Sequence, residues 1–257
     1  MGQNKTKEKL AKGEAVYGVP MTINAPSLVE LLALAGMDFV MLDAEGGPLD
    51  PSEVENLARA SELTGITPLV RVPVNRPEVI GIFLDRGAHG VVVPKVSSAE
   101  EAAAVVRAAK FPPEGNRGFA PARWTITYRG ETDLYAAANR ETLVICMVED
   151  PVGMAAIGDI ASVPGVDAVH IGPNDLALSL GHGANTWHEE VLELVDKAVA
   201  TVTALGSPFP VMGVGAIPPS QTDRYRAYQE QGVRYFQVAL PGLINGATRR
   251  FFEAVRA

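Results

Sequence analysis

Short apolar segments recur along the chain, and each is followed by a loop and an amphipathic helical pattern. Eight such segments occupy residues 15–19, 38–43, 68–72, 90–94, 142–149, 168–172, 210–214 and 235–240. They are continuous apolar runs, which is typical of parallel strands buried on both faces. The helical patterns between them begin at Ser or Pro-Ser and end at Gly, as in residues 51–65. Eight alternating strands and helices predict an α/β fold, the (β/α)8 TIM barrel.

A doubly wound open sheet is the alternative arrangement of such units. It usually carries a glycine-rich phosphate loop after the first strand, and the segment GVPMTINAPS is not such a loop. The chain shows no linker or break in composition, so we expect one barrel domain over residues 1–257. Residues 111–140 form an insertion between the fourth and fifth strands, and we expect a lid or a subunit contact there.

Charge and composition exclude several classes of partner. The net charge of −8 and the pI near 5.1 argue against nucleic acid and anionic membranes. No apolar run reaches transmembrane length, and the polar start of the chain is not a signal peptide. The one cysteine, Cys146, lies in an apolar run, which indicates a small buried hydrophobic residue and excludes a disulfide framework. These features predict a cytoplasmic protein.

Charged residues stand where the predicted strands end. Because the active site of such a barrel lies at the carboxyl ends of its strands, these residues are candidates for catalysis. Asp43 and Glu45 follow the second strand, Arg71 ends the third, Glu149 the fifth, and Asp175 comes shortly after the sixth.

Glu149 and Asp175 form the sharpest pair. Neighbouring strands are about 5 Å apart, so acids after the fifth and sixth strands can converge on one ion. Two carboxylates without a nearby His or Cys favour a hard cation such as Mg²⁺ or Mn²⁺. The alternative is that each acid caps the helix that follows it, since acids favour helix N-termini. The spacing alone leaves both interpretations open.

Three further residues have two interpretations each. Arg71 at the mouth either binds an anion or carbonyl oxygen of a substrate or forms an ion pair with Asp43 or Glu45, and the two can coexist. His170 lies within the sixth strand, which favours a hydrogen-bonded core histidine over a base. Trp124 in the insertion is a candidate lid residue that contacts substrate, although a packed surface loop is the commoner case.

Several segments together resemble the HpcH/HpaI family of class II pyruvate aldolases. They are FVMLDAEGGP, LVRVPVNRPEVIGIFLDRGAHGVVVPKVSSAEEA, FPPEGNRGFAPARW, MVEDPVG and GVDAVHIGPNDLALSLG, which cover most of residues 16–240. The resemblance implies a phosphoenolpyruvate/pyruvate-type barrel whose last helix is exchanged between subunits. It also implies a homo-oligomer, which would be a dimer, trimer or hexamer.

The resemblance also implies roles for individual residues. Glu149 and Asp175 match the ligands of a divalent metal, Mg²⁺ or Mn²⁺ and less commonly Co²⁺. Arg71 matches the arginine at the keto oxygen of pyruvate and its enolate. Asp43 and Glu45 match the acids of the D-x-E-H motif. The substrate-binding turn spans Gly172, Pro173, Asn174 and Asp175, where the backbone amides of the last two match the donors to the pyruvate carboxylate. The partners would be a 2-oxo acid and an aldehyde or other acceptor.

Gly46 departs from the family pattern. The family places a histidine there, paired with the aspartate, to move the proton of the aldol hydroxyl, and such proton transfer typically contributes about 10²–10⁴-fold. Ordinary aldol cleavage should therefore be slow unless another group replaces it, and we expect the glycine to leave room for a bulkier acceptor. Three alternatives stay open: oxaloacetate decarboxylation, atypical carbon–carbon bond formation through the same enolate, and a non-catalytic protein that binds 2-oxo acids.

Overall fold

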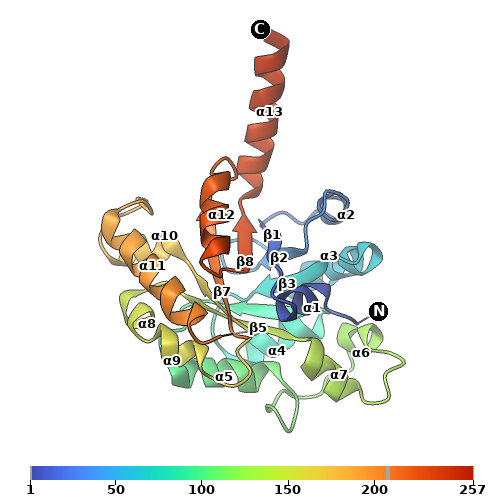
Figure 1. The fold of residues 1–257 in the computed structure, drawn as a ribbon. Coiled ribbons are helices and arrows are strands. Elements are labelled where there is room, and N and C mark those ends of the chain that lie inside the picture. Colours follow the sequence, from blue (N-terminus) through green and yellow to red (C-terminus); the bar gives the residue numbers. More distant parts are fainter. Residues whose placement is uncertain (1, 207–208, 257) are drawn as a thin grey trace.

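The computed structural model describes residues 2–206 and 209–256 and shows one closed barrel of eight parallel strands in sequence order (Figure 1). The strands are β1 (Val16–Met21), β2 (Phe39–Asp43), β3 (Thr67–Arg71), β4 (Gly90–Val93), β5 (Leu143–Val148), β6 (Ala168–Ile171), β7 (Val211–Ile217) and β8 (Tyr235–Val238). β8 pairs with β1 and closes the ring. The predicted (β/α)8 barrel is confirmed.

Helices alternate with the strands along the chain, and most of them surround the barrel (Figure 1). They are α1 (Lys5–Ala11), α2 (Pro26–Leu34), α3 (Pro51–Thr64), α4 (Pro77–Asp85), α5 (Ala99–Ala109), α6 (Arg123–Thr127), α7 (Leu134–Glu141), α8 (Pro151–Ala155), α9 (Ile157–Ala161), α10 (Pro173–Ser179), α11 (Glu189–Thr203), α12 (Thr222–Glu230) and α13 (Leu240–Arg256). Sequence signals fix several of their ends. Asp50 and Glu53 form a capping box at the start of α3, and Gly65 ends that helix in the left-handed conformation.

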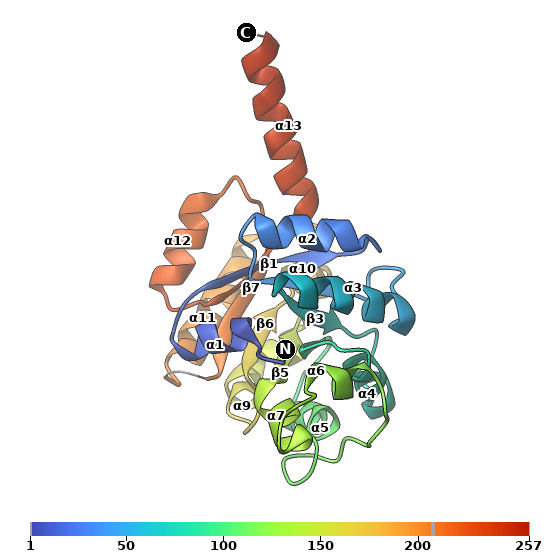
Figure 2. The ribbon, with the colours of Figure 1, turned by 90° about the vertical axis from the view of Figure 1, so that its right-hand side faces the viewer.

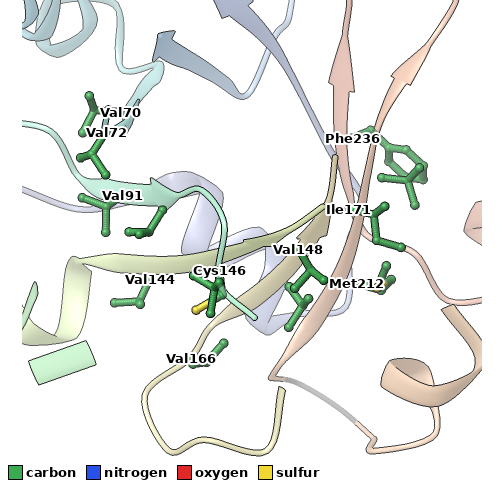
Figure 3. Close-up of a cluster of buried hydrophobic side chains, with 14 of the residues drawn as sticks. Val70, Val72, Val91, Val144, Cys146, Val148, Val166, Ile171, Met212 and Phe236 are labelled. Atoms are coloured by element: carbon green, nitrogen blue, oxygen red, sulfur yellow. The ribbon is translucent and has the colours of Figure 1, made fainter. Parts of the chain in front are cut away.

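Two layers of apolar side chains hold the strands in place. Side chains that point outward from the strands pack beneath the helices, as Val70, Val144 and Ile171 do in Figure 3. Side chains that point inward, such as Phe39 and Tyr235, stack within the barrel with ring centroids 4.6 Å apart. The barrel is therefore a packed core rather than a pore, and the active sites of such barrels lie at the carboxyl ends of the strands.

Helix α1 closes the amino end of the barrel, a feature that the sequence patterns above did not predict. Asn4 caps the helix and binds the carbonyl of His89, while Leu10 is fully buried among the inward-pointing side chains. Lys7 forms an ion pair with Asp167 at 3.0 Å. The local signal was the N-cap asparagine, but charged residues dominate the segment.

The insertion at residues 111–140 carries α6 and α7 and also lies toward the amino end. Its Arg123 pairs with Glu62 of α3, its Arg117 pairs with Asp85 of α4 at 2.7 Å, and Tyr128 stacks near His89 at the start of β4. A lid over the mouth of this chain's own barrel is therefore the wrong interpretation. The subunit contact stays a prediction.

Helix α13 projects away from the barrel (Figures 1 and 2). Most of its side chains are exposed, including the apolar Ile244, Phe251 and Val255. An exposed apolar helix is consistent with a subunit contact, and exchange of this helix between subunits stays a prediction. Within residues 2–206 and 209–256, none of the helices is long and apolar enough to cross a membrane.

Candidate active site

The strand register places Asp43 and Arg71 side by side at the carboxyl end of the barrel. They are the last residues of β2 and β3 and face each other in the ladder. Nε of Arg71 donates to Oδ1 of Asp43 at 2.9 Å, and Nη2 donates to Oδ2 at 2.6 Å. Nη1 lies 3.2 Å from Oε2 of Glu45. The expected ion pair across the mouth is confirmed, and its forked geometry holds the guanidinium in one orientation.

Gly46 lies directly beside this pair. Its backbone N–H donates to Oδ1 of Asp43 at 2.9 Å. A Cβ atom at this position would come within 2.8 Å of Nη2 of Arg71 and 3.1 Å of Oδ2 of Asp43. The sequence suggested an open space next to the glycine. The structure shows that the guanidinium of Arg71 occupies the inner part of this space.

Glu149 follows β5 and is the most deeply buried acid at this end of the barrel, with only 3% of its surface exposed. Its Oε1 accepts a hydrogen bond from the backbone N–H of Lys95 at 3.0 Å. Among the described residues its Oε2 has no hydrogen-bond partner. Burial, together with the negative charges of Asp175 and Glu45, raises the pKa of Glu149 to about 7. The carboxylate is thus held in a state that a cation would stabilise.

Neighbouring residues explain why Glu149 is directed inward. Asp150 caps α8 by accepting a hydrogen bond from the N–H of Gly153 at 2.8 Å, so the capping role belongs to Asp150 rather than to Glu149. A Cβ atom on Gly172 would lie 2.7 Å from Oε2 of Glu149. Glycine at this position therefore allows the close approach of the carboxylate to the end of β6.

Asp175 occupies the first turn of α10 and is exposed. Its charge contributes to the raised pKa values of both Glu149 and Glu45, so the three acids share one region of the mouth. Carboxylate oxygens are the ligands that hard divalent cations prefer, and the unpartnered buried Oε2 of Glu149 is an oxygen that such an ion would satisfy. Glu149 and Asp175 are therefore the residues that fit a metal.

A second group of possible ligands lies on the loop between α10 and α11. His182, His188 and Glu190 bring their ligand atoms within 4.8 Å of one another. The two imidazole rings stack with centroids 3.5 Å apart and planes 12° apart. Because a metal lies in the plane of each coordinating ring, parallel stacked rings do not converge on one ion. This geometry favours the carboxylates at the mouth.

His170 is a core residue, as its position within the strand predicted. It is 1% exposed and packs edge-on against Tyr235. Burial, and to a smaller extent the charge of Arg71, lowers the pKa of His170 to about 3, so the ring is neutral. The side chain of Gln237 hydrogen-bonds the ring, as expected of a core histidine, although Nδ1 has no hydrogen-bond partner among the described residues.

The structure thus brings together most of the candidate residues and separates one. Asp43, Glu45, Arg71 and Glu149 meet at the mouth, and the turn 172–175 lies beside them. Trp124 does not join this group. It is 2% exposed, its Nε1 donates to the carbonyl of Ala120, and its ring packs on Phe111 with centroids 4.7 Å apart. The prediction that Trp124 contacts substrate is therefore wrong for this chain's own barrel, because the ring serves as the core of the insertion.

Lys95 is a site residue to which the sequence patterns gave no role. It directly follows Pro94 after β4, so its place at a strand end was visible in the sequence. Its backbone contact with Glu149 depends on a left-handed backbone conformation, with φ at 56°. The pattern of residue types in a sequence does not predict a hydrogen bond that is donated by the main chain.

Comparison with known proteins agrees with this geometry. Residues 17–242 match the model of the HpcH/HpaI aldolase/citrate lyase family. A 5-keto-4-deoxy-D-glucarate aldolase from Salmonella paratyphi A is 33% identical over 254 residues, which are 98% of this chain and 97% of the relative.

Solved structures give the same result. An HpcH/HpaI aldolase/citrate lyase family protein from Burkholderia cenocepacia superposes with a TM-score of 0.88 at 31% identity, covering 99% of this chain and all of the other. The citrate synthase SbnG superposes with a TM-score of 0.82 at 31% identity, covering 97% and 96% of the two chains. The chain therefore belongs to the HpcH/HpaI aldolase/citrate lyase family, and it is a carbon–carbon lyase of the aldolase type.

Proposed function

We propose that this lyase depends on a divalent metal and acts on a 2-oxo acid through its enolate. One observation carries the proposal. At the same mouth, an oriented guanidinium, Arg71, meets a buried carboxylate, Glu149, whose Oε2 has no partner among the described residues. A cation site next to a fixed positive charge suits a reaction in which negative charge develops on the substrate.

Arg71 has donors to spare for the substrate. Guanidinium carries five N–H groups, of which two bind Asp43 and one more points toward Glu45. The remaining N–H groups, on Nη1 and Nη2, can donate to the keto oxygen of a 2-oxo acid. Because Asp43 fixes the guanidinium before substrate arrives, the site does not have to reorganise when the charge forms on that oxygen.

Glu149 and Asp175 would hold the metal, which we expect to be Mg²⁺ or Mn²⁺, with Co²⁺ a possible substitute. When bound, such a cation supplies Lewis-acid stabilisation of the negative charge on the keto oxygen. The backbone amides of Asn174 and Asp175 lie in the first turn of α10, where N–H groups have no carbonyl partner within the helix. We assign them, with Gly172 and Pro173, to the carboxylate of the 2-oxo acid.

The proton-transfer half of the reaction distinguishes this chain from an ordinary aldolase. Gly46 offers no imidazole, and the space beside it holds the Arg71–Asp43 pair. Oxaloacetate decarboxylation reaches the same enolate without deprotonating a hydroxyl group, so it is the second candidate. The similarity to the citrate synthase SbnG makes carbon–carbon bond formation the third. Family membership favours all three over a protein that only binds 2-oxo acids.

A substrate panel tests the proposal. Purified protein is assayed with oxaloacetate and a series of 4-hydroxy-2-oxo acids, each with Mg²⁺, Mn²⁺ and excess chelator. We expect metal-dependent pyruvate release, with oxaloacetate turned over faster than the hydroxy acids. Binding of 2-oxo acids by calorimetry without turnover of any substrate would support the non-catalytic alternative instead. A cytoplasmic location and a homo-oligomeric state stay predictions.

A further inference from the structure

Lys95 adopts a backbone conformation that lysine rarely adopts. Its φ of 56° is the only positive φ of a non-glycine residue in the described part of the chain. A left-handed backbone is unfavourable for an ordinary L-residue, because its Cβ atom crowds the following carbonyl oxygen, and glycine avoids this cost. Strain of this kind persists only where the surrounding structure imposes it.

Contacts on both sides impose this conformation. The N–H of Lys95 donates to Oε1 of Glu149 at 3.0 Å, and the N–H of Val96 donates to the carbonyl of Met147 at 3.0 Å. The strand end is thus turned so that a main-chain donor reaches the buried carboxylate. This requirement explains the backbone, but it does not explain the side chain, because glycine would meet it at lower cost.

The lysine side chain carries a charge that the site does not otherwise use. Lys95 is exposed, and no carboxylate of the described residues lies within 4 Å of its ammonium group. The hydrogen bond from its backbone to Glu149 places the residue at the mouth, and its positive charge opposes the rise in the pKa of Glu45. Arg71 is the other cation at a strand end, and it is committed to Asp43 and Glu45. Lys95 is therefore the strand-end cation that remains available to an anionic ligand.

We propose that the ammonium group of Lys95 binds a carboxylate on the acceptor half of the substrate, so that the enzyme prefers 2-oxo acids that carry a second, distal carboxylate. The inference rests on the proposed function, since it places the 2-oxo end of the substrate at Arg71 and Glu149. A lysine on a flexible stem suits this role, because it can follow acceptors of different length as a point charge.

Two substrates that differ in one group provide the test. Both are 4-hydroxy-2-oxo acids of equal chain length, one ending in a carboxylate and the other in a methyl group. Lys95→Met removes the charge and keeps the strained backbone, Lys95→Gly removes both the charge and the strain, and Lys95→Arg keeps the charge. A charged hydrogen bond contributes about 1.5–3 kcal/mol, so we expect the Met and Gly variants to raise KM for the dicarboxylate about 10–100-fold.

The outcomes separate the side chain from the backbone. The methyl-terminated substrate should show an unchanged KM in all three variants, and Lys95→Arg should retain most of the preference for the dicarboxylate. Equal changes for both substrates, or a wild-type enzyme without preference, would overturn the inference. Loss of activity in Lys95→Met but not in Lys95→Gly would show that only the backbone conformation at this position matters, and it would overturn the role of the ammonium group.

A binding measurement keeps this test apart from the proposed function. If the wild-type protein turns over neither compound, the proposed function fails, and calorimetry with the same two compounds and Mg²⁺ then decides the role of Lys95. We expect tighter binding of the dicarboxylate by about 10–100-fold, and loss of that difference in Lys95→Met. Equal affinities in the wild-type protein would contradict the inference.

Discussion

The two ends of the barrel differ in how completely they pair their buried charges, although Asp43 at the carboxyl end does pair with Arg71. At the amino end a buried acid and two half-buried acids face cations: Asp167 pairs with Lys7, Asp85 with Arg117, and Glu62 with Arg123. At the carboxyl end Glu149 has other acids as its neighbours, and its Oε2 has no partner among the described residues. The amino end is built for stability, whereas the carboxyl end keeps an uncompensated charge that a ligand can satisfy.

His89 shows how the amino end tolerates an exception. Both ring nitrogens are buried without a partner among the described residues. Burial lowers the pKa of His89 to about 4, so the ring is neutral and carries no uncompensated charge at neutral pH. Buried polar atoms without a hydrogen-bond partner therefore occur at both ends of the barrel. Glu149, an acid with other acids as neighbours, lies at the mouth.

Removing the charge of Glu149 should give the largest effect. Glu149→Gln keeps the shape and an amide oxygen for the N–H of Lys95, but it loses the anionic ligand. We expect kcat/KM to fall about 10²–10³-fold, with a urea midpoint at pH 8 that is equal to or higher than that of the wild type. An active variant, or one that is strongly destabilised, would show that Glu149 stabilises the fold, as the paired acids of the amino end do.

The opposite pattern is expected at the amino end. Asp85→Asn leaves Arg117 buried without its anion, and the free energy of unfolding should fall by about 3 kcal/mol. The substitution lies away from the mouth, so kcat/KM below the unfolding transition should not change. Urea denaturation and a steady-state assay measure the two quantities, and a loss of activity in the folded variant would contradict the contrast.

Gly46→Ala tests the fixed guanidinium. The added Cβ would lie 2.8 Å from Nη2 of Arg71, so the guanidinium has to move. We expect kcat/KM to fall about tenfold, less than the ~100-fold that a 1 Å misplacement can cost, because the guanidinium is the far end of a flexible side chain. Gly81→Ala is the matched control, since its Cβ meets no atom within 4 Å and α4 should become slightly more stable.

Gly46→His asks whether the lost proton-transfer group can be restored. The imidazole brings back the residue of the family motif, but it requires Arg71 to shift. A faster cleavage of 4-hydroxy-2-oxo acids would show that the loop still supports proton transfer. A slower reaction with every substrate would show that the Arg71–Asp43 pair leaves no room for an imidazole at this position.

The smallest expected effect is on the pH dependence of stability. Because the folded-state pKa of Glu149 lies above its ordinary value of 4.5, the folded protein binds the proton more tightly than the unfolded chain. The metal-free protein should therefore lose stability as the pH rises from about 4.5 to about 7. Urea midpoints with chelator present measure this slope, which should be absent in Glu149→Gln. A rising contribution from Glu149 over that interval would contradict the raised pKa.

The sequence predicted the barrel because its signals are local and repeated. Eight apolar runs, with capping residues such as Asp50 and Gly65 between them, determine strand and helix without long-range information. The acids and the arginine of the mouth were found for the same reason, since every strand end lies at one edge of the barrel. Helix α1 escaped prediction because its stability comes from partners far along the chain, such as Asp167 and the carbonyl of His89.

Other features depended on contacts that no local pattern reports. Trp124 was a candidate lid residue, with a packed loop as the commoner case, and its partners Phe111 and Ala120 make it the core of the insertion. Gly46 looked like a gap, whereas Arg71 from the next strand fills the space beside it. In both cases the tertiary neighbours of the residue decided its role.

Exchange of the pyruvate methyl protons tests the central claim most directly, because it needs only the enolate half of the reaction. The wild-type protein is incubated with pyruvate in D2O, with Mg²⁺ or with excess chelator, and the methyl signal is followed by NMR beside Glu149→Gln and Arg71→Met. We expect exchange that requires the cation and that falls at least 10²-fold in both variants. Exchange that survives chelation at the full rate in Glu149→Gln, or no exchange in the wild-type protein with any cation, would contradict the account.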